Sequence, residues 1–226
     1  MNEPRTVVIL GKGTLAIRIA EWFHGSKQYR LQAVVPVVPE PTWTDSLTKW
    51  ARLDGVAVAE SGQYTDVFQI IEEPIDLAFS VFYDKILPGS FIEACGRVLN
   101  IHNGPLPRYR GVSPINWALK NNEQRHGITI HEITPGIDDG PIVAQLDYTI
   151  YPEFDEVIDV YGRAMEYGWT LFHQTISLLD QIQPVPQDNT RATYFRRQDD
   201  ELLGDRRYFT RAESLKRDRG AFQPER

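Results

Sequence analysis

Apolar residues along the chain form short β-branched runs that alternate with stretches of helical spacing. The runs predict strands at residues 5–10, 31–38, 56–59, 75–82, 97–101, 128–133 and 141–150, the last as an edge or hairpin strand. The stretches between them predict helices at 15–23, 47–53, 63–73, 88–95 and 113–121. Strands that alternate with helices predict a parallel sheet with helices on both faces.

A long amphipathic helix is predicted over residues 155–183. Its apolar face consists of Val157, Tyr161, Ala164, Gly168, Phe172 and Ile176. From Pro184 onward the chain is first rich in proline and then charged, without clear periodicity. We therefore divide the chain into one domain, residues 1–188, and a C-terminal tail, residues 189–226.

The composition is that of an ordinary globular protein. With 226 residues, 42% hydrophobic and 24% charged, it excludes disordered, collagen-like and disulfide-scaffold classes. The net charge is −7 and unevenly distributed, because residues 191–226 hold ten basic and seven acidic side chains. The acidic remainder, with 14 basic and 24 acidic side chains, argues against binding of nucleic acid over the whole surface.

Targeting signals are not evident in the sequence. Cys95 is the single cysteine, residues 1–5 form no apolar signal stretch, and no run approaches the roughly 20 apolar residues of a membrane span. We therefore expect a cytoplasmic protein without disulfides and without membrane contact.

A glycine turn follows the first predicted strand. It consists of Gly11, Lys12, Gly13 and Thr14, and with Ala16 in the third glycine position it loosely matches the dinucleotide fingerprint. The ribose-binding acid of that motif is missing after the second strand, where the first carboxylate is Glu40, so NAD is disfavoured. Two interpretations of this turn remain: it binds an anion at the start of the helix with help from Lys12, or it is a tight turn without a ligand.

Candidate chemistry lies at the end of the predicted strand 97–101. Asn100 and His102 are two residues apart, so their side chains leave a strand on the same face. A carboxamide can stabilise a developing oxyanion and an imidazole can move a proton near neutral pH, which suits chemistry at a carbonyl group. Asp138, in a loop bounded by glycine and proline, could orient that imidazole. The alternative is a capping Asn, a packed His and a turn Asp.

The other histidines show no convergent partners in the sequence. His126 and His131 could be combined with Asp138 as metal ligands, but their spacing matches no closed site. We therefore expect no metal.

Four motifs carry a family resemblance. They are Asn100-Ile101-His102, Leu106-Pro107 with Arg110-Gly111, Gly127-Ile128-Thr129, and Asp138-Asp139-Gly140-Pro141. Together they resemble the formyltransferase family that uses 10-formyltetrahydrofolate, over about residues 5–185. The resemblance implies a Rossmann-like α/β domain with a mostly parallel sheet, a long C-terminal helix and a short tail. It also implies that Asn100, His102 and Asp138 are catalytic and that 10-formyltetrahydrofolate is the co-substrate.

The resemblance extends to two binding segments. Residues 81–88 look like the family loop that lines the folate pocket, and residues 135–139 like its facing wall. The implied folate-binding residues are Phe82, Tyr83, Ile86, Leu87 and Asp139. The Gly11–Thr14 turn resembles the loop that holds the acceptor phosphate in glycinamide ribonucleotide enzymes. One departure is Asn103-Gly104-Pro105-Leu106-Pro107, where the family commonly has Ser-Leu-Leu-Pro.

The molecule that accepts the formyl group is inferred by comparing branches of the family that this chain resembles. Met-tRNA enzymes use a second, basic domain, and glycinamide ribonucleotide enzymes lack the stretch seen here at 107–118. Both observations fit a nucleotide-linked amino deoxysugar, whose pyrophosphate could meet Lys12, Arg108 or Arg110 and whose base could meet Trp43 or Tyr109. Glycinamide ribonucleotide and Met-tRNA remain as alternative acceptors, and a formyltetrahydrofolate hydrolase and a non-catalytic folate- or nucleotide-binding module as other classes. We expect a homodimer, with Tyr208, Phe209 and Phe222 of the tail packed on the body or on a second subunit.

Overall fold

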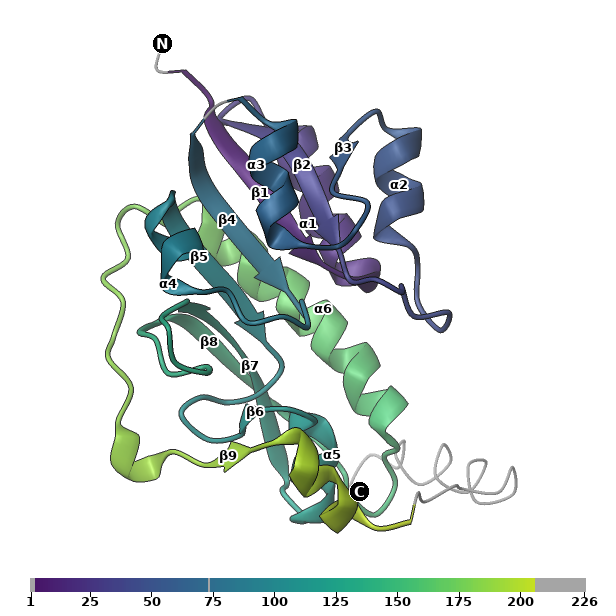
Figure 1. Cartoon of the computed structure of the whole chain (residues 1–226). Helices are drawn as coiled ribbons and strands as arrows, with labels where there is room; N and C mark the ends of the chain where they lie inside the picture. Colours follow the sequence, from purple (N-terminus) through teal and green to yellow (C-terminus); the bar gives the residue numbers. More distant parts are fainter. Residues whose placement is uncertain (1–2, 73, 206–226) are drawn as a thin grey trace, which may run out of the picture.

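The computed structural model describes residues 3–72 and 74–205, which are built on one large sheet (Figure 1). Its seven strands lie in the order β3-β2-β1-β4-β5-β7-β8. The strand bounds are β1 (Arg5–Gly11), β2 (Tyr29–Pro36), β3 (Ala57–Val58), β4 (Ile75–Val81), β5 (Cys95–His102), β7 (Arg125–Glu132) and β8 (Ile142–Thr149). The first five strands in this order are parallel, and β7 and β8 pair antiparallel. The expected mostly parallel α/β sheet is confirmed.

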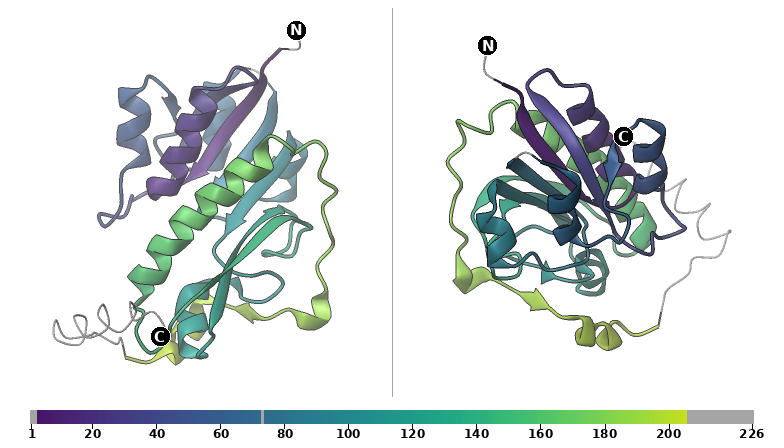
Figure 2. Two further views of the ribbon diagram at one scale, coloured as in Figure 1. Left: turned by 180° about the vertical axis from the view of Figure 1, so that it is seen from behind. Right: turned by 45° about the horizontal axis from the view of Figure 1, so that its top comes forward.

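Helices cover both faces of the sheet. The α-helices are α1 (Gly13–His24), α2 (Leu47–Leu53), α3 (Val67–Ile70), α4 (Gly89–Glu93), α5 (Pro114–Lys120) and α6 (Val157–Ile176), and η1 (Tyr64–Asp66) is a 3₁₀ turn. Helices α1 and α6 lie side by side on one face, and α3 and α4 lie on the other (Figures 1 and 2). No helix in the described ranges combines the length and apolarity needed to cross a bilayer.

Two predicted helices are shorter in the structure. The stretch 63–73 is divided between η1 and α3, and the backbone is already extended at Ile71. The last backbone hydrogen bond of this turn runs from Ile71 N to Val67 O at 3.1 Å. The long helix ends at Ile176, after which the chain continues in turns as far as 181.

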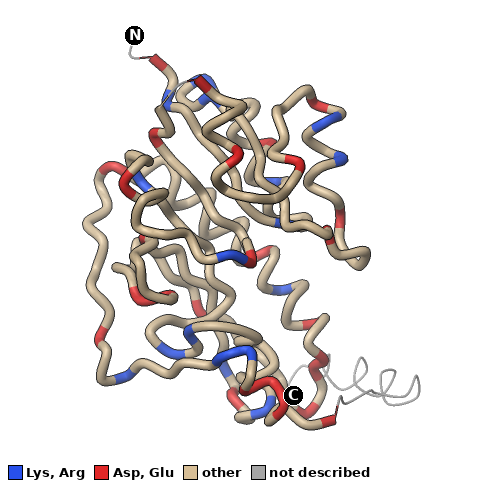
Figure 3. The backbone as a smooth tube through the Cα atoms, in the orientation of Figure 1, with Lys and Arg blue, Asp and Glu red and all other residues tan. Residues whose placement is uncertain are grey.

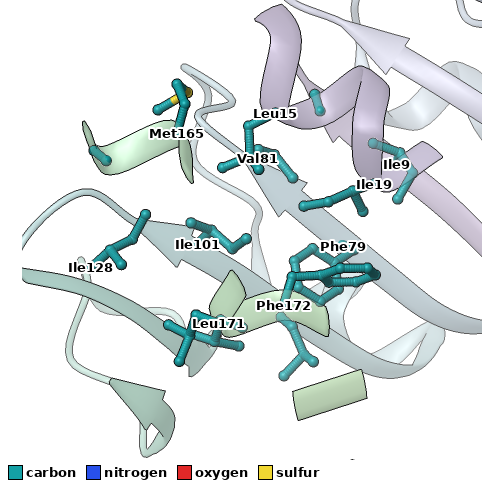
Figure 4. Close-up of a cluster of buried hydrophobic side chains, with 14 of the residues drawn as sticks. Ile9, Leu15, Ile19, Phe79, Val81, Ile101, Ile128, Met165, Leu171 and Phe172 are labelled. Carbon is teal, nitrogen blue, oxygen red and sulfur yellow. The ribbon is translucent and has the colours of Figure 1, made fainter. Parts of the chain in front are cut away.

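The larger of two hydrophobic clusters lies between the sheet and the pair α1 and α6. Phe79 of β4 and Phe172 of α6 meet at its centre with ring centroids 5.5 Å apart (Figure 4). Gly168 lets α6 approach closely, because a Cβ atom there would lie 2.8 Å from Ile128 Cδ1 and 2.8 Å from Leu15 Cδ2. A side chain at that position would therefore require Ile128 and Leu15 to shift within the core.

The carboxyl ends of β1 and β4 meet at Gly11. A Cβ atom on Gly11 would lie 2.1 Å from Val81 O, and the residue has a φ of +155°. Lys12 N donates to the same carbonyl oxygen at 3.2 Å. The glycine is thus required by the close approach of two neighbouring strand ends.

The segment after α6 returns across the domain. It runs along one edge and then past β6 (Arg110–Gly111), through η2 (Asn189–Arg191), β9 (Tyr194–Phe195) and η3 (Arg197–Leu203) (Figures 1 and 2). β9 pairs in parallel with β6, and the Phe195 ring stacks on Trp117 at 4.3 Å. We call residues 184–195 the C-terminal strap. Residues 206–226, including Tyr208, Phe209 and Phe222, lie outside the described residues.

Charged residues of both signs are interspersed along the described chain (Figure 3). Several pair across elements, as Arg5 does with Asp180 at 2.8 Å and Arg97 with Glu132 at 2.9 Å. Over residues 3–72 and 74–205, positive and negative residues are thus mixed rather than gathered in one basic stripe.

Candidate active site

The strand pair β5 and β7 brings three polar side chains together at the antiparallel junction of the sheet. Asn100 and His102 are on β5, and the antiparallel register places Asn100 opposite His131 of β7. Asn100 Nδ2 lies 3.1 Å from His131 Nε2, and the rings of His102 and His131 are 6.4 Å apart. His131 therefore has partners at this site, contrary to the expectation from the sequence.

Asp138 reaches this group from the loop between β7 and β8. Its residue adopts a left-handed φ of 51°, which is uncommon for a non-glycine residue. Asp138 Oδ2 lies 3.4 Å from His102 Nδ1 and accepts a hydrogen bond from Gly111 N at 2.8 Å, while Oδ1 lies 3.5 Å from His131 Nε2. The carboxylate thus sits between two imidazole rings.

The electrostatics of the pair favour an ionised Asp138 beside a neutral His102. Burial lowers the pKa of His102 below its usual 6.5, and the neighbouring Asp138 only partly offsets this effect. Burial raises the pKa of Asp138, but His102, His131 and the Gly111 N–H outweigh it and hold the pKa well below 3.8. The His102 imidazole is therefore in its unprotonated form at neutral pH, with a lone pair available to accept a proton.

The hydrogen bonds of His102 decide which nitrogen acts. Its Nε2 lies 2.7 Å from Tyr109 O, and since a carbonyl oxygen only accepts, Nε2 carries the hydrogen. Nδ1 is then the nitrogen with a free lone pair in the neutral ring, and it faces Asp138. Gly104 packs against the Nε2 side of the His102 ring, where a Cβ atom would lie only 2.8 Å from Nε2.

The segment expected to line a folate pocket is only partly accessible. Ile86 is 67% exposed and Phe82, with a φ of 58°, lies against Tyr161 at 6.3 Å. Tyr83 is half-buried, with its hydroxyl donating to Gly62 O at 2.6 Å. Leu87 is only 4% exposed within the smaller core cluster, so its side chain supports this segment from beneath. A role of Leu87 in the pocket wall is therefore left to its backbone and stays a prediction.

Asp139 lies in the facing loop. It accepts a hydrogen bond from the Thr134 hydroxyl and borders a shallow hollow with Arg110, Ile137 and Tyr194. A Cβ atom on Gly136 would collide with its carboxylate. The loop therefore presents an apolar side chain beside an acid.

The residues expected to bind the acceptor are spread over two places. At the glycine turn, Lys12 N is bonded to Val81 O and the Thr14 hydroxyl donates to Asp45 Oδ2 at 3.0 Å. Gly13 has a φ of +76° and packs against Thr44. Trp43 beside this turn is 60% exposed, with its ring edge-on to Tyr161 at 5.3 Å.

Tyr109 is buried, contrary to its expected role at a nucleotide base. It is 3% exposed, its ring lies against Phe195, and its hydroxyl donates to Glu123 Oε1 at 2.7 Å. A ring enclosed in this way cannot stack on a ligand, so the expectation was wrong. Arg108 is also held by Glu123, at 3.0 Å, and Arg110 donates to Gln187 and Asn189.

Comparison with known proteins gives consistent similarities. A family model described as formyl transferase matches residues 18–176. A methionyl-tRNA formyltransferase of Deinococcus radiodurans is 35% identical over 127 residues, which is 56% of this chain and 40% of the relative. One from Synechococcus sp. is 31% identical over 168 residues, 70% of this chain and 49% of the relative. The chain thus spans at most about half the length of these curated relatives.

Solved structures share the fold. An N-formyltransferase from Helicobacter canadensis, in complex with folinic acid and dTDP-3-aminofucose, is similar with a TM-score of 0.74 and 25% identity, over 94% of this chain and 78% of that chain. A phosphoribosylglycinamide formyltransferase from Bacillus halodurans is similar with a TM-score of 0.66 and 23% identity, over 77% of this chain and 95% of that one.

Proposed function

Because this chain belongs to the formyl transferase family, we propose that it transfers a formyl group from 10-formyltetrahydrofolate to the amine of a nucleotide-linked amino deoxysugar. The observation that carries the proposal is the convergence of Asn100, His102 and Asp138 within hydrogen-bonding or ion-pair reach of one another or of His131. These are a carboxamide, an imidazole and a carboxylate, the groups that acyl transfer to an amine requires.

The residues divide the work of the reaction. 10-Formyltetrahydrofolate supplies the formyl group when bound. Asn100 donates an amide N–H toward the negative charge that develops on the formyl oxygen. His102 Nδ1 takes the proton that the attacking amine loses as its nitrogen bonds to the formyl carbon. Asp138 stabilises the resulting imidazolium, and the proton then passes to the folate nitrogen that leaves.

The exposed side chains fit a folate heterocycle. Ile86 and Ile137 offer apolar surface, and Asp139 offers a carboxylate that would accept hydrogen bonds from the amino groups of a pterin. These apolar side chains and this carboxylate match the apolar ring and the amino groups of a pterin in chemical character. Phe82, Ile86 and the 135–139 loop are the residues that would hold the ring.

The sugar acceptor is supported by similarity and charge. The Helicobacter canadensis protein was solved with a nucleotide-linked amino sugar, and its structure overlaps almost all of this chain. Residues 1–190, with 14 basic and 24 acidic side chains, offer little attraction to a tRNA acceptor stem. Met-tRNA is the second candidate, because the curated relatives carry that activity in their names. A homodimer and a cytoplasmic location stay predictions.

A side-by-side turnover assay tests the acceptor. The protein is incubated with 10-formyltetrahydrofolate and, separately, dTDP-, GDP- and UDP-linked amino sugars, glycinamide ribonucleotide and Met-tRNA. We expect turnover with at least one amino sugar. Activity on glycinamide ribonucleotide or Met-tRNA alone would reject the sugar acceptor, and rapid formate release without any amine would identify a hydrolase.

The roles of the site residues are tested with His102→Asn and Asp138→Asn. Each removes a proton-transfer or stabilising group, so kcat should fall by a factor on the order of 10² or more. Thermal melting shows whether the variants are folded. Turnover near the wild-type value in a folded variant contradicts the assignment.

A further inference from the structure

The C-terminal strap carries one side chain that reaches the loop of Asp138. Gln187 Nε2 donates to Asp138 O at 2.8 Å and to Gly140 O at 2.7 Å. Its Oε1 accepts from Arg110 Nε at 3.1 Å and Arg110 Nη2 at 2.7 Å. A single side chain therefore joins the strap to both segments that build the Asp138 contact.

Only a carboxamide satisfies this arrangement. Two carbonyl oxygens need two N–H donors, and a guanidinium edge needs an acceptor with two lone pairs. The amide of Gln187 provides both, and its neighbours fix which end faces which partner. A carboxylate would keep the Arg110 contact but would set oxygen against the carbonyls of Asp138 and Gly140.

The bonds of Gln187 act on the geometry of the carboxylate. Asp138 is held at a φ of 51°, a conformation that a non-glycine residue keeps only where its surroundings enforce it. Arg110 directly precedes Gly111, whose N–H donates to Asp138 Oδ2. Gln187 thus restrains the backbone of Asp138 on one side and the donor to its side chain on the other.

The strap has anchors that do not depend on Gln187. Tyr109 N donates to Thr193 Oγ1 at 2.8 Å, Val112 N donates to Phe195 O at 3.0 Å, and Phe195 stacks on Trp117. Loss of the Gln187 amide should therefore leave the fold and the strap in place. The effect to be expected is local, at the Asp138 loop.

We propose that Gln187 is a positioning residue that fixes the Asp138 carboxylate against His102 for proton transfer. This inference rests on the proposed function for its catalytic meaning. The coupling of Gln187 to His102 through Asp138 does not depend on which molecule receives the formyl group.

The test compares two substitutions of Gln187 with a matched control. Gln187→Met keeps the length of the side chain and removes every hydrogen bond without adding charge. Gln187→Glu retains the acceptor for Arg110 only. Gln183→Met makes the same change at an exposed position directly before the strap. We expect kcat to fall by about 10-fold to 100-fold in both Gln187 variants, with KM for the folate changed less than about twofold, because small displacements of a catalytic group cost this much. Gln183→Met should match the wild type.

A second readout does not need activity. The five histidines of the chain can be followed by NMR, and His102 can be identified from the signal that is lost in His102→Asn. A displaced Asp138 stabilises the imidazolium less, so in Gln187→Met the titration midpoint of His102 should move to lower pH by about half a pH unit or more. Gln183→Met should leave the midpoint in place.

The outcomes separate the two proposals. If the wild-type protein transfers formyl to none of the acceptors, the proposed function fails, and the titration of His102 still decides the role of Gln187. An unchanged His102 midpoint in folded Gln187→Met overturns the inference, whether or not kcat falls. A lowered midpoint together with a kcat-selective loss supports it.

Discussion

Each imidazole at the site has a backbone carbonyl as partner, which fixes where its hydrogen lies. Tyr109 O holds the hydrogen of His102 on Nε2, and Glu132 O lies 2.9 Å from His131 Nδ1 and holds the hydrogen there. In the neutral ring His131 Nε2 is then an acceptor, and it receives one N–H of Asn100. In the proposed mechanism, the second N–H of that amide donates to the formyl oxygen.

This arrangement gives His131 a measurable role. His131→Phe removes the acceptor and lets the Asn100 amide rotate, so kcat should fall by about 10-fold or more. His131→Gln offers a carbonyl oxygen in place of Nε2 and should retain more turnover than His131→Phe. Steady-state kinetics on both variants, with thermal melting to confirm folding, checks this. Equal activity in the wild type and His131→Phe would contradict the role.

The sequence predicts some of the site residues and cannot predict others. Asn100 and His102 are found because a spacing of two in a strand places both side chains on one face. His131 joins them only through the β5–β7 register, a pairing across 31 residues that no local pattern records. Tyr109 was misjudged because residue type alone does not show that Phe195, far along the chain, covers its ring.

At the scale of elements, α6 packs across one face of the sheet and against α1. It contacts α1, β7 and β8, and Gly168 marks its closest approach to β7 and α1. Gly162 in the same helix has nothing within 4 Å of its notional Cβ. The two glycines thus differ in packing while sharing the same backbone environment.

Alanine substitutions of these glycines should have opposite effects. Gly162→Ala gains helix propensity and should raise the free energy of unfolding by about 0.5–1 kcal/mol. Gly168→Ala gains the same propensity but forces Ile128 and Leu15 to shift within a filled core, so a net loss of roughly 1 kcal/mol is expected. Urea denaturation of both variants measures the difference. A stabilised Gly168→Ala would mean that the core has room at this point.

The sequence predicts the strands that have a strong local hydrophobic pattern. It does not predict the strands that form only by pairing with a distant segment. The β-branched runs of β1, β2, β4 and β7 predict strands from composition alone. β9 has two residues and exists because it meets β6, more than 80 positions earlier. Its sequence neighbourhood is charged and without period, so the chain there looked unstructured.

At the scale of the whole molecule, the family and the α/β fold expected from the motifs are confirmed. The stability of this fold should also depend on the protonation of a second buried histidine, His126. His126 at the start of β7 is buried, its Nε2 donates to Asn103 O at 3.0 Å, and its Nδ1 has no hydrogen-bond partner among the described residues. Burial lowers the pKa of His126 from 6.5 to about 4.

Stability should therefore decline with acidification over a defined range. The unfolded chain takes up a proton at His126 near pH 6.5 and the folded chain only near pH 4, so the free energy of unfolding falls as the pH drops between these values. The shift corresponds to a loss of about 3 kcal/mol. His126→Gln should show a smaller loss by that amount in denaturation curves between about pH 7 and about pH 4.

A matched control is available on α6. His173 is exposed, so His173→Gln should keep the pH dependence of the wild type. Equal pH dependence in the wild type and His126→Gln would show that His126 is protonated as readily in the folded state as in the unfolded chain.

The position of the C-terminal strap in the sequence also fixes when its contacts can form during synthesis. Translation proceeds from the N-terminus, so all seven strands of the main sheet and α6 leave the ribosome before residues 184–195. A nascent chain that ends at Ile176 has every buried core residue except Leu179 and the side chains of Asn100, His102 and Asp138. Gln187, Thr193 and Phe195 have not yet been made. Within the described chain, the contacts around Asp138 are completed only when synthesis has passed the strap, later than the sheet that carries them.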